Sequence, residues 1–369
     1  MTPPAPASRP AVSVVAVHYR TPGLLDPALR AVAQQLEAVG VGFELLVVDN
    51  SADAPELELA ATRVLRPAGN LGYAGGLAAG VEASRGEVLV AMNPDVVVLP
   101  GCLGALLEAL AAGAGAAGPR FFWDAGRRLL LPPAEERSLA SELLRALAAR
   151  AAVLGPLARR RWRRHARRHW MASQPLASFA LSGALLAIRR AAWDAVGPFD
   201  AGYPLYFEET DWLERARRRG VRASYVPGAE AVHRFDQSGR LEHRREEWYA
   251  RSCRRFRERR YGRLAARLLE RVEATPSAAG APPARLPPAR VAEPVWVEVS
   301  PRAQGFPAAA EPGVAAIGSW QLPAEIRAHH PDLGLYLTWS DRRGRELGRH
   351  ALGGADRVAL RLDETRGPI

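Results

Sequence analysis

The stretch VSVVAVHY, residues 12–19, is a short run of apolar and β-branched side chains that predicts a buried strand. Apolar residues at helical spacing follow at 27–39, and a second strand-like run, FELLVV, covers residues 43–48. The alternation continues, with strands predicted at 62–65, 87–92 and 116–122 and helices at 75–83 and 100–112. Strands that alternate with helices predict an α/β fold, with a mostly parallel sheet covered by helices on both faces.

The rest of the chain has a different organisation. A helical stretch at 134–170 is predicted as a basic insertion, followed by a strand at 181–188 and helices at 208–219 and 246–272. Two short strands are predicted between these helices, at 222–226 and 231–233. Residues 274–294 hold six prolines and predict a linker. We therefore expect a leader at 1–10, a main domain at 11–273, the linker, and a small β-rich domain at 295–369. Its strands are predicted at 295–299, 334–339 and 358–362.

Composition limits the class of protein. The 369 residues suit about two domains, and 48 % hydrophobic with 24 % charged residues excludes disorder throughout and a collagen-like repeat. Two distant cysteines form no disulfide framework and no zinc site, which favours a reducing compartment. The first residues lack the apolar core of a signal peptide, and no apolar run approaches the roughly 20 residues of a spanning helix. We expect a cytoplasmic protein, soluble or peripheral on the inner face of the membrane.

The net charge of +11 comes from 50 arginines, without any lysine, against 39 acids. Two windows, 159–170 and 251–263, hold seven arginines each, and the remaining chain is close to neutral. Such windows are either solvated helix faces in an arginine-rich chain or contacts for phosphates. Window 159–170 could lie on a membrane surface or meet a lipid-diphosphate acceptor.

Polar residues stand where the first predicted strands end. Tyr19 ends the first strand, Asp49 and Asn50 follow the second, and Asn93-Pro94-Asp95 follows the strand at 87–92. Each group alone could be an ordinary turn or helix cap. Because ligands of such sheets bind beyond the carboxyl ends of the strands, together they predict a binding site at one sheet edge.

A glycine-rich segment, Asn70-Leu71-Gly72-Tyr73-Ala74-Gly75-Gly76, opens a predicted helix. Glycines allow a ligand to approach the backbone, and a helix N-terminus favours anions. The segment is neither a P-loop nor the dinucleotide fingerprint. A tight loop before a helix is the alternative.

An acidic cluster begins the helix predicted at 208–219. Glu208, Glu209 and Asp211 either complement the helix dipole or supply a general base. The nearby Tyr206 and Trp212 could pack on a sugar ring, although Trp212 could equally be core. His233 is either structural or, beside acids, a ligand for an ion of the Mg²⁺ or Mn²⁺ class.

In this order the segments resemble the family 2 glycosyltransferases, especially the rhamnosyltransferase-like branch. The resemblance spans roughly residues 10–265 and rests on ordered motifs: VSVVAVHY, LVVDNS, NLGYAGG, MNPD, GPR, LSGALLAIRR, VGPFD, YFEETDW, YVP and AVH. The C-terminal 75 residues are not covered. Asn-Pro-Asp replaces the usual Asp-x-Asp, Glu-Glu replaces Glu-Asp, and His18-Tyr19-Arg20 replaces the more usual Asn-Tyr-Asn.

The resemblance implies a GT-A fold and an inverting transfer of a sugar from a nucleotide-diphosphate sugar, of the dTDP-rhamnose or UDP-sugar class, to a saccharide or lipid-linked acceptor. It implies Glu209 as the base, with Glu208 second and Asp211 in the same set. Asp95 and His233 would hold Mg²⁺ or Mn²⁺. Ser182, Gly183, Tyr206 and Trp212 would face the sugars. The nucleotide-sugar side would be formed by Tyr19, Asp49, Asn50, Asn70, Gly72, Gly76, Asn93 and Asp95.

The process implied is assembly of a bacterial cell-envelope polysaccharide or glycoconjugate. The alternative from another class is a non-catalytic protein that binds carbohydrate or nucleic acid through its basic segments. No sequence pattern of a nucleic-acid-binding module supports the latter, so no nucleic-acid partner is expected.

Overall fold

The computed structural model describes residues 10–51, 62–234, 244–274, 291–331 and 333–352. The chain divides into two compact units. Unit 1 comprises Met1–Phe122, Pro133–Leu139 and Arg168–Glu270, and unit 2 comprises Trp123–Pro132, Ala140–Arg167 and Arg271–Ile369. The predicted leader, most of the predicted linker and the predicted strand at 358–362 lie outside the described residues.

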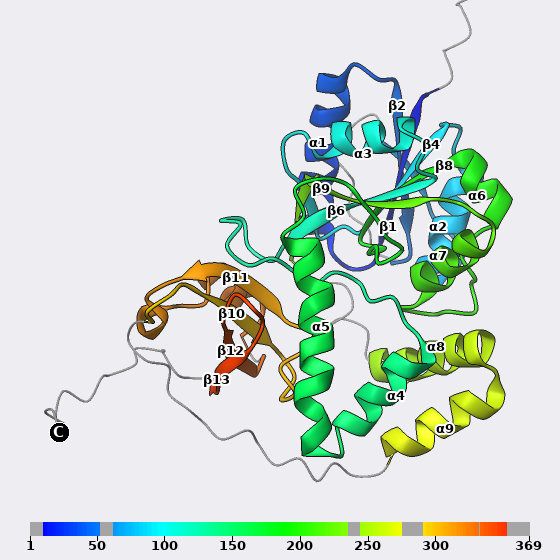
Figure 1. Ribbon diagram of the computed structural model, residues 1–369. Coiled ribbons are helices and arrows are strands. Elements are labelled where there is room, and N and C mark those ends of the chain that lie inside the picture. Colours follow the sequence, from blue (N-terminus) through cyan, green and yellow to red (C-terminus); the bar gives the residue numbers. More distant parts are fainter. Residues whose placement is uncertain (1–9, 52–61, 235–243, 275–290, 332, 353–369) are drawn as a thin grey trace, which may run out of the picture. The chain divides into compact units, whose positions relative to one another are not determined.

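Unit 1 is built on a nine-stranded sheet in the order β3-β2-β1-β4-β8-β6-β9-β5, with β7 paired to β9 (Figure 1). The strands on one half, β1 to β4, are parallel, whereas β5, β7 and β8 run antiparallel to their neighbours. The strands are β1 (Val12–His18), β2 (Phe43–Asp49), β3 (Thr62–Leu65), β4 (Val88–Met92), β5 (Val96–Val98), β6 (Ala116–Phe122), β7 (Leu176–Ala177), β8 (Leu185–Arg189) and β9 (Ala223–His233). The predicted mostly parallel α/β sheet is confirmed.

Helices cover both faces of this sheet, as the alternation predicted. Because successive strand residues point to opposite faces, Val14 of β1 packs with Leu29 and Leu106, while the next residue, Val15, belongs to the core with Leu77 and Trp212. The helices of unit 1 are α1 (Pro22–Val39), α2 (Gly72–Ala83), α3 (Cys102–Ala111), α6 (Arg190–Val196), α7 (Glu208–Arg218), α8 (Arg245–Tyr261) and most of α9 (Arg263–Ala274).

Two predicted boundaries in unit 1 were wrong. The long helix predicted at 246–272 is two helices, α8 and α9, which are interrupted at Gly262. Gly262 has a positive φ of 84°, which glycine adopts without strain. The two short strands predicted at 222–226 and 231–233 form one strand, β9, whose pairing with β6 shifts register after Pro119.

Unit 2 contains a separate antiparallel sheet in the order β11-β10-β12-β13, which confirms the predicted β-rich module. Its core includes Val297, Leu337 and Trp339, with Trp320 packed beside them. The elements are α4 (Leu139–Ala148, begun in unit 1), the 3-10 turn η1 (Ala152–Leu154), α5 (Gly155–Trp170, ending in unit 1), β10 (Val295–Ser300), β11 (Ala309–Val314), η3 (Ile317–Ser319), α10 (Ala324–His329), β12 (Leu335–Ser340) and β13 (Glu346–Leu352).

The basic insertion predicted at 134–170 as part of the main domain requires a correction. Residues Ala140–Arg167 belong to unit 2. The reason is a buried ion pair, in which Arg163 Nε lies 2.8 Å from Glu298 Oε2 and the two side chains are 4 % and 0 % exposed. Arg167 donates to Ser340 Oγ at 2.9 Å. Window 159–170 is therefore not a uniformly solvated or membrane-facing surface. Among the described residues, no helix is both long and apolar enough to cross a bilayer.

Candidate active site

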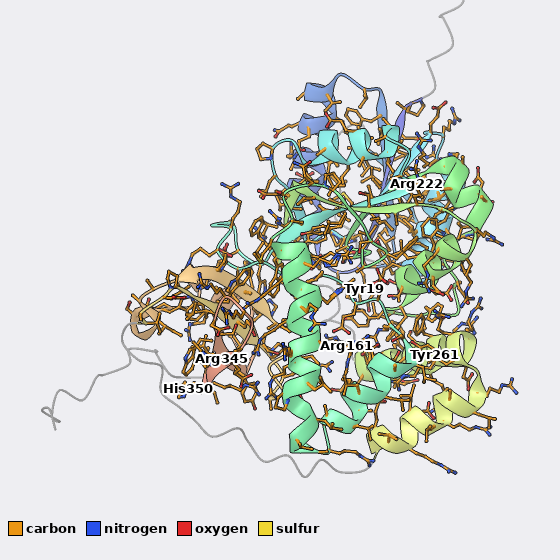
Figure 2. The ribbon with its side chains drawn as sticks, in the orientation of Figure 1. Tyr19, Arg161, Arg222, Tyr261, Arg345 and His350 are labelled. Carbon is orange, nitrogen blue, oxygen red and sulfur yellow. The ribbon has the colours of Figure 1, made fainter. Side chains whose placement is uncertain are left out.

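A cavity of about 280 Å³ lies in unit 1, where β1, β2 and β4 end. It brings together most of the residues that the sequence singled out, including Tyr19 (labelled in Figure 2). The predicted residues that line it are Tyr19, Asn50, Asn70, Gly72, Asn93, Ser182, Gly183, Tyr206, Glu208, Glu209 and His233. Asp49, Gly76, Asp95, Asp211 and Trp212 do not line it. The expectation of a site at the carboxyl ends of parallel strands agrees with this placement.

Asp49 and Asn50 form the turn that shapes one side of the cavity. The buried Asp49 carboxylate accepts hydrogen bonds from Ser51 N at 2.9 Å and Ser51 Oγ at 2.8 Å. Its Oδ1 atom also lies 3.2 Å from His18 Nδ1, across the β1–β2 register. Asn50 donates to Gly72 O at 3.0 Å and accepts from Leu71 N at 3.2 Å. Asn50 therefore holds the glycine-rich loop against β2.

The glycine-rich loop leads directly into α2. Gly72 has φ of 69°, and a Cβ atom there would lie 3.0 Å from Pro204 O, so both conformation and space favour glycine. Asn70 Oδ1 accepts from Gly72 N at 2.8 Å, which closes a local turn. Gly76 lies one turn into α2, where a Cβ would be 2.9 Å from Val17 Cγ1. Gly76 thus allows α2 to pack closely on β1 and stands behind the cavity wall.

Asp95 and His233 face each other at the far strand ends. The antiparallel pairing of β5 with β9 places Val96 opposite His233, and His233 Nε2 lies 3.4 Å from Asp95 Oδ1. Asp95 is 2 % exposed. Among the described residues, no group of three or more His, Cys, Asp or Glu side chains could hold a metal ion. A carboxylate–imidazole pair nevertheless fits an ion of the Mg²⁺ or Mn²⁺ class that takes its other ligands from substrate phosphates and water.

Glu208 and Glu209 begin α7 after two residues in the left-handed region, Tyr206 at φ 64° and Phe207 at φ 71°. The Oε2 atoms of both glutamates are buried and make no hydrogen bond with any described residue. Burial, and then the charge of Glu209, hold the pKa of Glu208 well above its ordinary value. Burial also raises the pKa of Glu209, although backbone hydrogen bonds and Arg137 lower it in part. Buried carboxylates with raised pKa values are suited to accept a proton near neutral pH.

Ser182 and Gly183 support this acidic pair from the segment before β8. A Cβ atom on Gly183 would lie 3.1 Å from Glu209 Cβ, so any larger residue there would push on the glutamate. Ser182 Oγ accepts from Ala184 N at 3.2 Å, which turns the backbone at the start of the strand. Tyr206 lines the cavity beside them and its hydroxyl accepts from Arg245 Nε at 3.2 Å.

Asp211 and Trp212 lie away from the cavity, although the sequence grouped them with the site. Asp211 Oδ2 accepts from Arg215 Nε at 2.8 Å, and its Oδ1 accepts from the Tyr203 hydroxyl at 3.3 Å. Trp212 is fully buried, stacks on Trp193 with ring centroids 6.1 Å apart, and donates to Gly197 O at 2.9 Å. The core alternative that the sequence left open for Trp212 is the one that the structure supports.

Sequence reasoning missed Tyr73 and Trp248, which both line the cavity. The Tyr73 hydroxyl donates to Gly183 O at 2.7 Å and so connects α2 with the segment before β8. Burial raises the pKa of Tyr73 well above its ordinary value, as do the charges of Glu208, Glu209 and Asp95. The aromatic residue inside the glycine-rich segment was the available signal for Tyr73. Trp248 lies on α8 and gives no comparable local signal.

Part of the chain is similar to a known protein family. Residues 13–192 match the family described as Glycosyl transferase family 2. The matched segment is slightly less than half of the chain. Two curated relatives, from Mycobacterium tuberculosis strains CDC 1551 / Oshkosh and ATCC 25618 / H37Rv, are each 34 % identical over 148 residues. Both are named N-acetylglucosaminyl-diphospho-decaprenol L-rhamnosyltransferase. The match covers 39 % of this chain and 46 % of each relative, so the chain spans about half the length of the relatives it matches.

Two solved structures were also found to be similar to the chain. One is GalNAc-T7 with UDP, GalNAc and Mn²⁺, with a TM-score of 0.44, 14 % identity, and coverage of 61 % of this chain and 44 % of that one. The other is the mannosyltransferase PcManGT from Pyrobaculum calidifontis with GDP-Man and Mn²⁺, with a TM-score of 0.40, 16 % identity, and coverage of 74 % and 76 %.

Proposed function

We propose that the chain is an inverting glycosyltransferase. It transfers a sugar from a nucleotide-diphosphate sugar to a hydroxyl group of a saccharide or lipid-linked saccharide. The observation that carries this proposal is the pair of buried carboxylates, Glu208 and Glu209, in the same cavity as His233, Asn50 and the start of α2. The match of residues 13–192 to family 2 supports the same reaction class.

In this proposal Glu209 is the general base. The acceptor hydroxyl oxygen forms a bond to the anomeric carbon of the donor while the bond from that carbon to the diphosphate oxygen breaks. Glu209 takes the hydroxyl proton at its Oε2 atom, which has no hydrogen-bond partner among the described residues. Backbone amides and Arg137 lower the pKa of Glu209 in part against the effect of burial, which favours the ionised form that a base requires. Glu208, whose pKa is raised further by the charge of Glu209, is suited to stay protonated beside it.

The negative charge that develops on the departing diphosphate is stabilised by nearby positive groups. Asp95 and His233 would hold a divalent cation, Mg²⁺ or Mn²⁺, which when bound supplies charge neutralisation to the leaving group. Gly72 begins α2 at the cavity, and the amide groups of a helix N-terminus favour a phosphate. Asn50 fixes the loop that precedes this terminus. Asp49, buried behind Asn50, positions the turn.

The donor that we propose is of the dTDP-rhamnose or UDP-sugar class, and the acceptor is a saccharide or lipid-linked saccharide. The support is the name of the two mycobacterial relatives, which describes rhamnosyl transfer to a lipid-linked N-acetylglucosaminyl diphosphate. The corresponding process is cell-envelope polysaccharide or glycoconjugate assembly at the inner face of the cytoplasmic membrane. Tyr206 and Trp248, both at the cavity, would provide aromatic surface for the sugars.

The test is turnover of a panel of nucleotide sugars by the full chain, with and without Mg²⁺ or Mn²⁺. Release of the nucleoside diphosphate is read by mass spectrometry. We expect one donor to be consumed, and consumption to depend on the cation. A protein that only binds carbohydrate or nucleic acid would leave every donor intact in the presence of acceptor, and that result would reject the proposal.

A further inference from the structure

Unit 2 contains a second cavity, of about 830 Å³, between α5 and the turn that joins β12 to β13. Its lining holds seven arginines against three acidic residues, an excess of four positive charges. All of the lining residues belong to unit 2. The family match ends at residue 192 and does not reach the β12–β13 side of this cavity. The cavity is therefore independent of the candidate active site.

The inner part of the cavity is a rigid, positively charged network. A single carboxylate oxygen, Glu346 Oε2, lies 2.9 Å from Arg159 Nε, 3.1 Å from Arg163 Nη2 and 3.1 Å from Arg349 Nη2. Burial alone would raise the pKa of Glu346, but the three guanidinium groups lower it. Arg163 is also paired with Glu298, so two carboxylates face three guanidinium groups. The positive charge that remains favours a further anion in this part of the cavity.

This network is held in place by additional bonds. Arg349 is 6 % exposed, donates to Thr338 Oγ1 at 3.1 Å and donates to Ala303 O at 2.8 Å. Arg163 is fixed by its Nε atom, which donates to both carboxylate oxygens of Glu298 at 2.9 and 2.8 Å. These side chains are already held in one arrangement by their hydrogen bonds. Binding of an anion therefore costs them little conformational entropy.

The outer part of the cavity offers donors that have no partner among the described residues. The Arg160 and Arg343 side chains make no hydrogen bond or ion pair with any described residue. Arg345, labelled in Figure 2 near the β12–β13 turn, is 78 % exposed and lies 3.2 Å from Asp341. The cavity thus combines an ordered inner network with two guanidinium groups at its mouth that have no partner in the part of the chain that the structure describes.

We propose that this cavity binds a diphosphate group. Guanidinium groups form bidentate bonds with phosphate oxygens, and a diphosphate carries enough charge to meet the excess in the lining. No aromatic side chain is among the described residues that line the cavity, and these residues offer no platform for stacking of a nucleic-acid base. The diphosphate belongs either to a soluble molecule or to the headgroup of a lipid. The inference does not depend on the proposed transferase activity.

The experiment is calorimetric titration of the full chain with inorganic pyrophosphate, in a buffer with EDTA so that no divalent cation is available to the candidate active site. We compare wild type with the double variant R160Q/R343Q, which removes the two guanidinium groups at the mouth of the cavity. The matched control is R161Q/R164Q, which removes the same charge from exposed residues of α5 that do not line the cavity (Arg161 is labelled in Figure 2).

We expect R160Q/R343Q to weaken pyrophosphate binding about tenfold or more, and the control to change it less than about twofold. A second arm uses phosphatidylcholine vesicles with and without a prenyl diphosphate. Vesicle binding that needs the prenyl diphosphate and is competed by pyrophosphate identifies a lipid source, whereas pyrophosphate binding alone identifies a soluble one. The proposal is overturned if wild type binds neither probe, or if the cavity variant and the control lose affinity equally.

Discussion

Glu209→Gln tests the assignment of the base most sharply. Glutamine has nearly the same size, so it can keep the packing against Gly183, but its amide cannot take a proton. General-base catalysis contributes about 10²- to 10⁴-fold to a rate, or roughly 3 to 5 kcal/mol of transition-state stabilisation. We expect kcat to fall by that factor with KM for the donor almost unchanged. The assay is initial-rate release of nucleoside diphosphate under saturating acceptor.

The matched control is Asp211→Asn, which changes another acid in the same turn of α7. Asp211 contacts Arg215, Tyr203 and, at 3.5 Å, Arg259, and it does not line the cavity. We expect its kcat to stay within about threefold of wild type and the free energy of unfolding to fall by about 1–3 kcal/mol, because charged hydrogen bonds are lost. Full activity of Glu209→Gln, or an equal loss in both variants, would refute the assignment.

Two further predictions concern charge at the same site. The pKa of Glu208 is raised in the folded state, so the folded protein loses stability as pH rises from the unfolded pKa through the raised folded value. Glu208→Gln removes this titration. The free energy of unfolding of the variant minus that of wild type, measured by urea unfolding, should therefore increase by about 1–3 kcal/mol as pH rises from about 4 to about 8. If this difference in unfolding free energy did not vary with pH, the raised pKa of the buried Glu208 carboxyl would be contradicted. Asp95→Asn removes one of the two side chains proposed to hold the cation, so calorimetric Mn²⁺ affinity in the presence of UDP should fall about tenfold or more, while UDP affinity in EDTA should not change. Unchanged Mn²⁺ affinity would exclude Asp95 as a ligand.

Much of the fold was predicted from local patterns in the sequence. The alternation of strands with helices along the chain predicted a sheet covered by helices on both faces, and Val14 and Val15 of β1 do contribute to opposite cores. Of the polar residues after β1, β2 and β4, Tyr19, Asn50 and Asn93 line one cavity, because the carboxyl ends of parallel strands share one edge. Asp49 and Asp95 do not line it. Glu208 and Glu209 were singled out as a pair, and both line the cavity.

Long-range partners explain what local patterns missed. The basic window in α5 resembled a solvated surface, but Arg163 is buried against Glu298, which lies 135 residues later. Likewise, Asp211 is drawn away from the cavity by Tyr203 and by Arg259 of α8. Trp248 reaches the cavity from α8 although no local motif marks it. In each case the decisive contact depends on the tertiary arrangement and not on nearby sequence.

The most direct test of the account is analysis of the product that the wild-type chain makes from a consumed donor and an acceptor saccharide. Mass spectrometry and NMR would report the added sugar and the configuration at its anomeric carbon. We predict a covalent glycoside whose anomeric configuration is inverted relative to the donor, and no such product with Glu209→Gln. A product with retained configuration, or free sugar with no glycoside, would contradict direct displacement by a base-activated acceptor in this cavity.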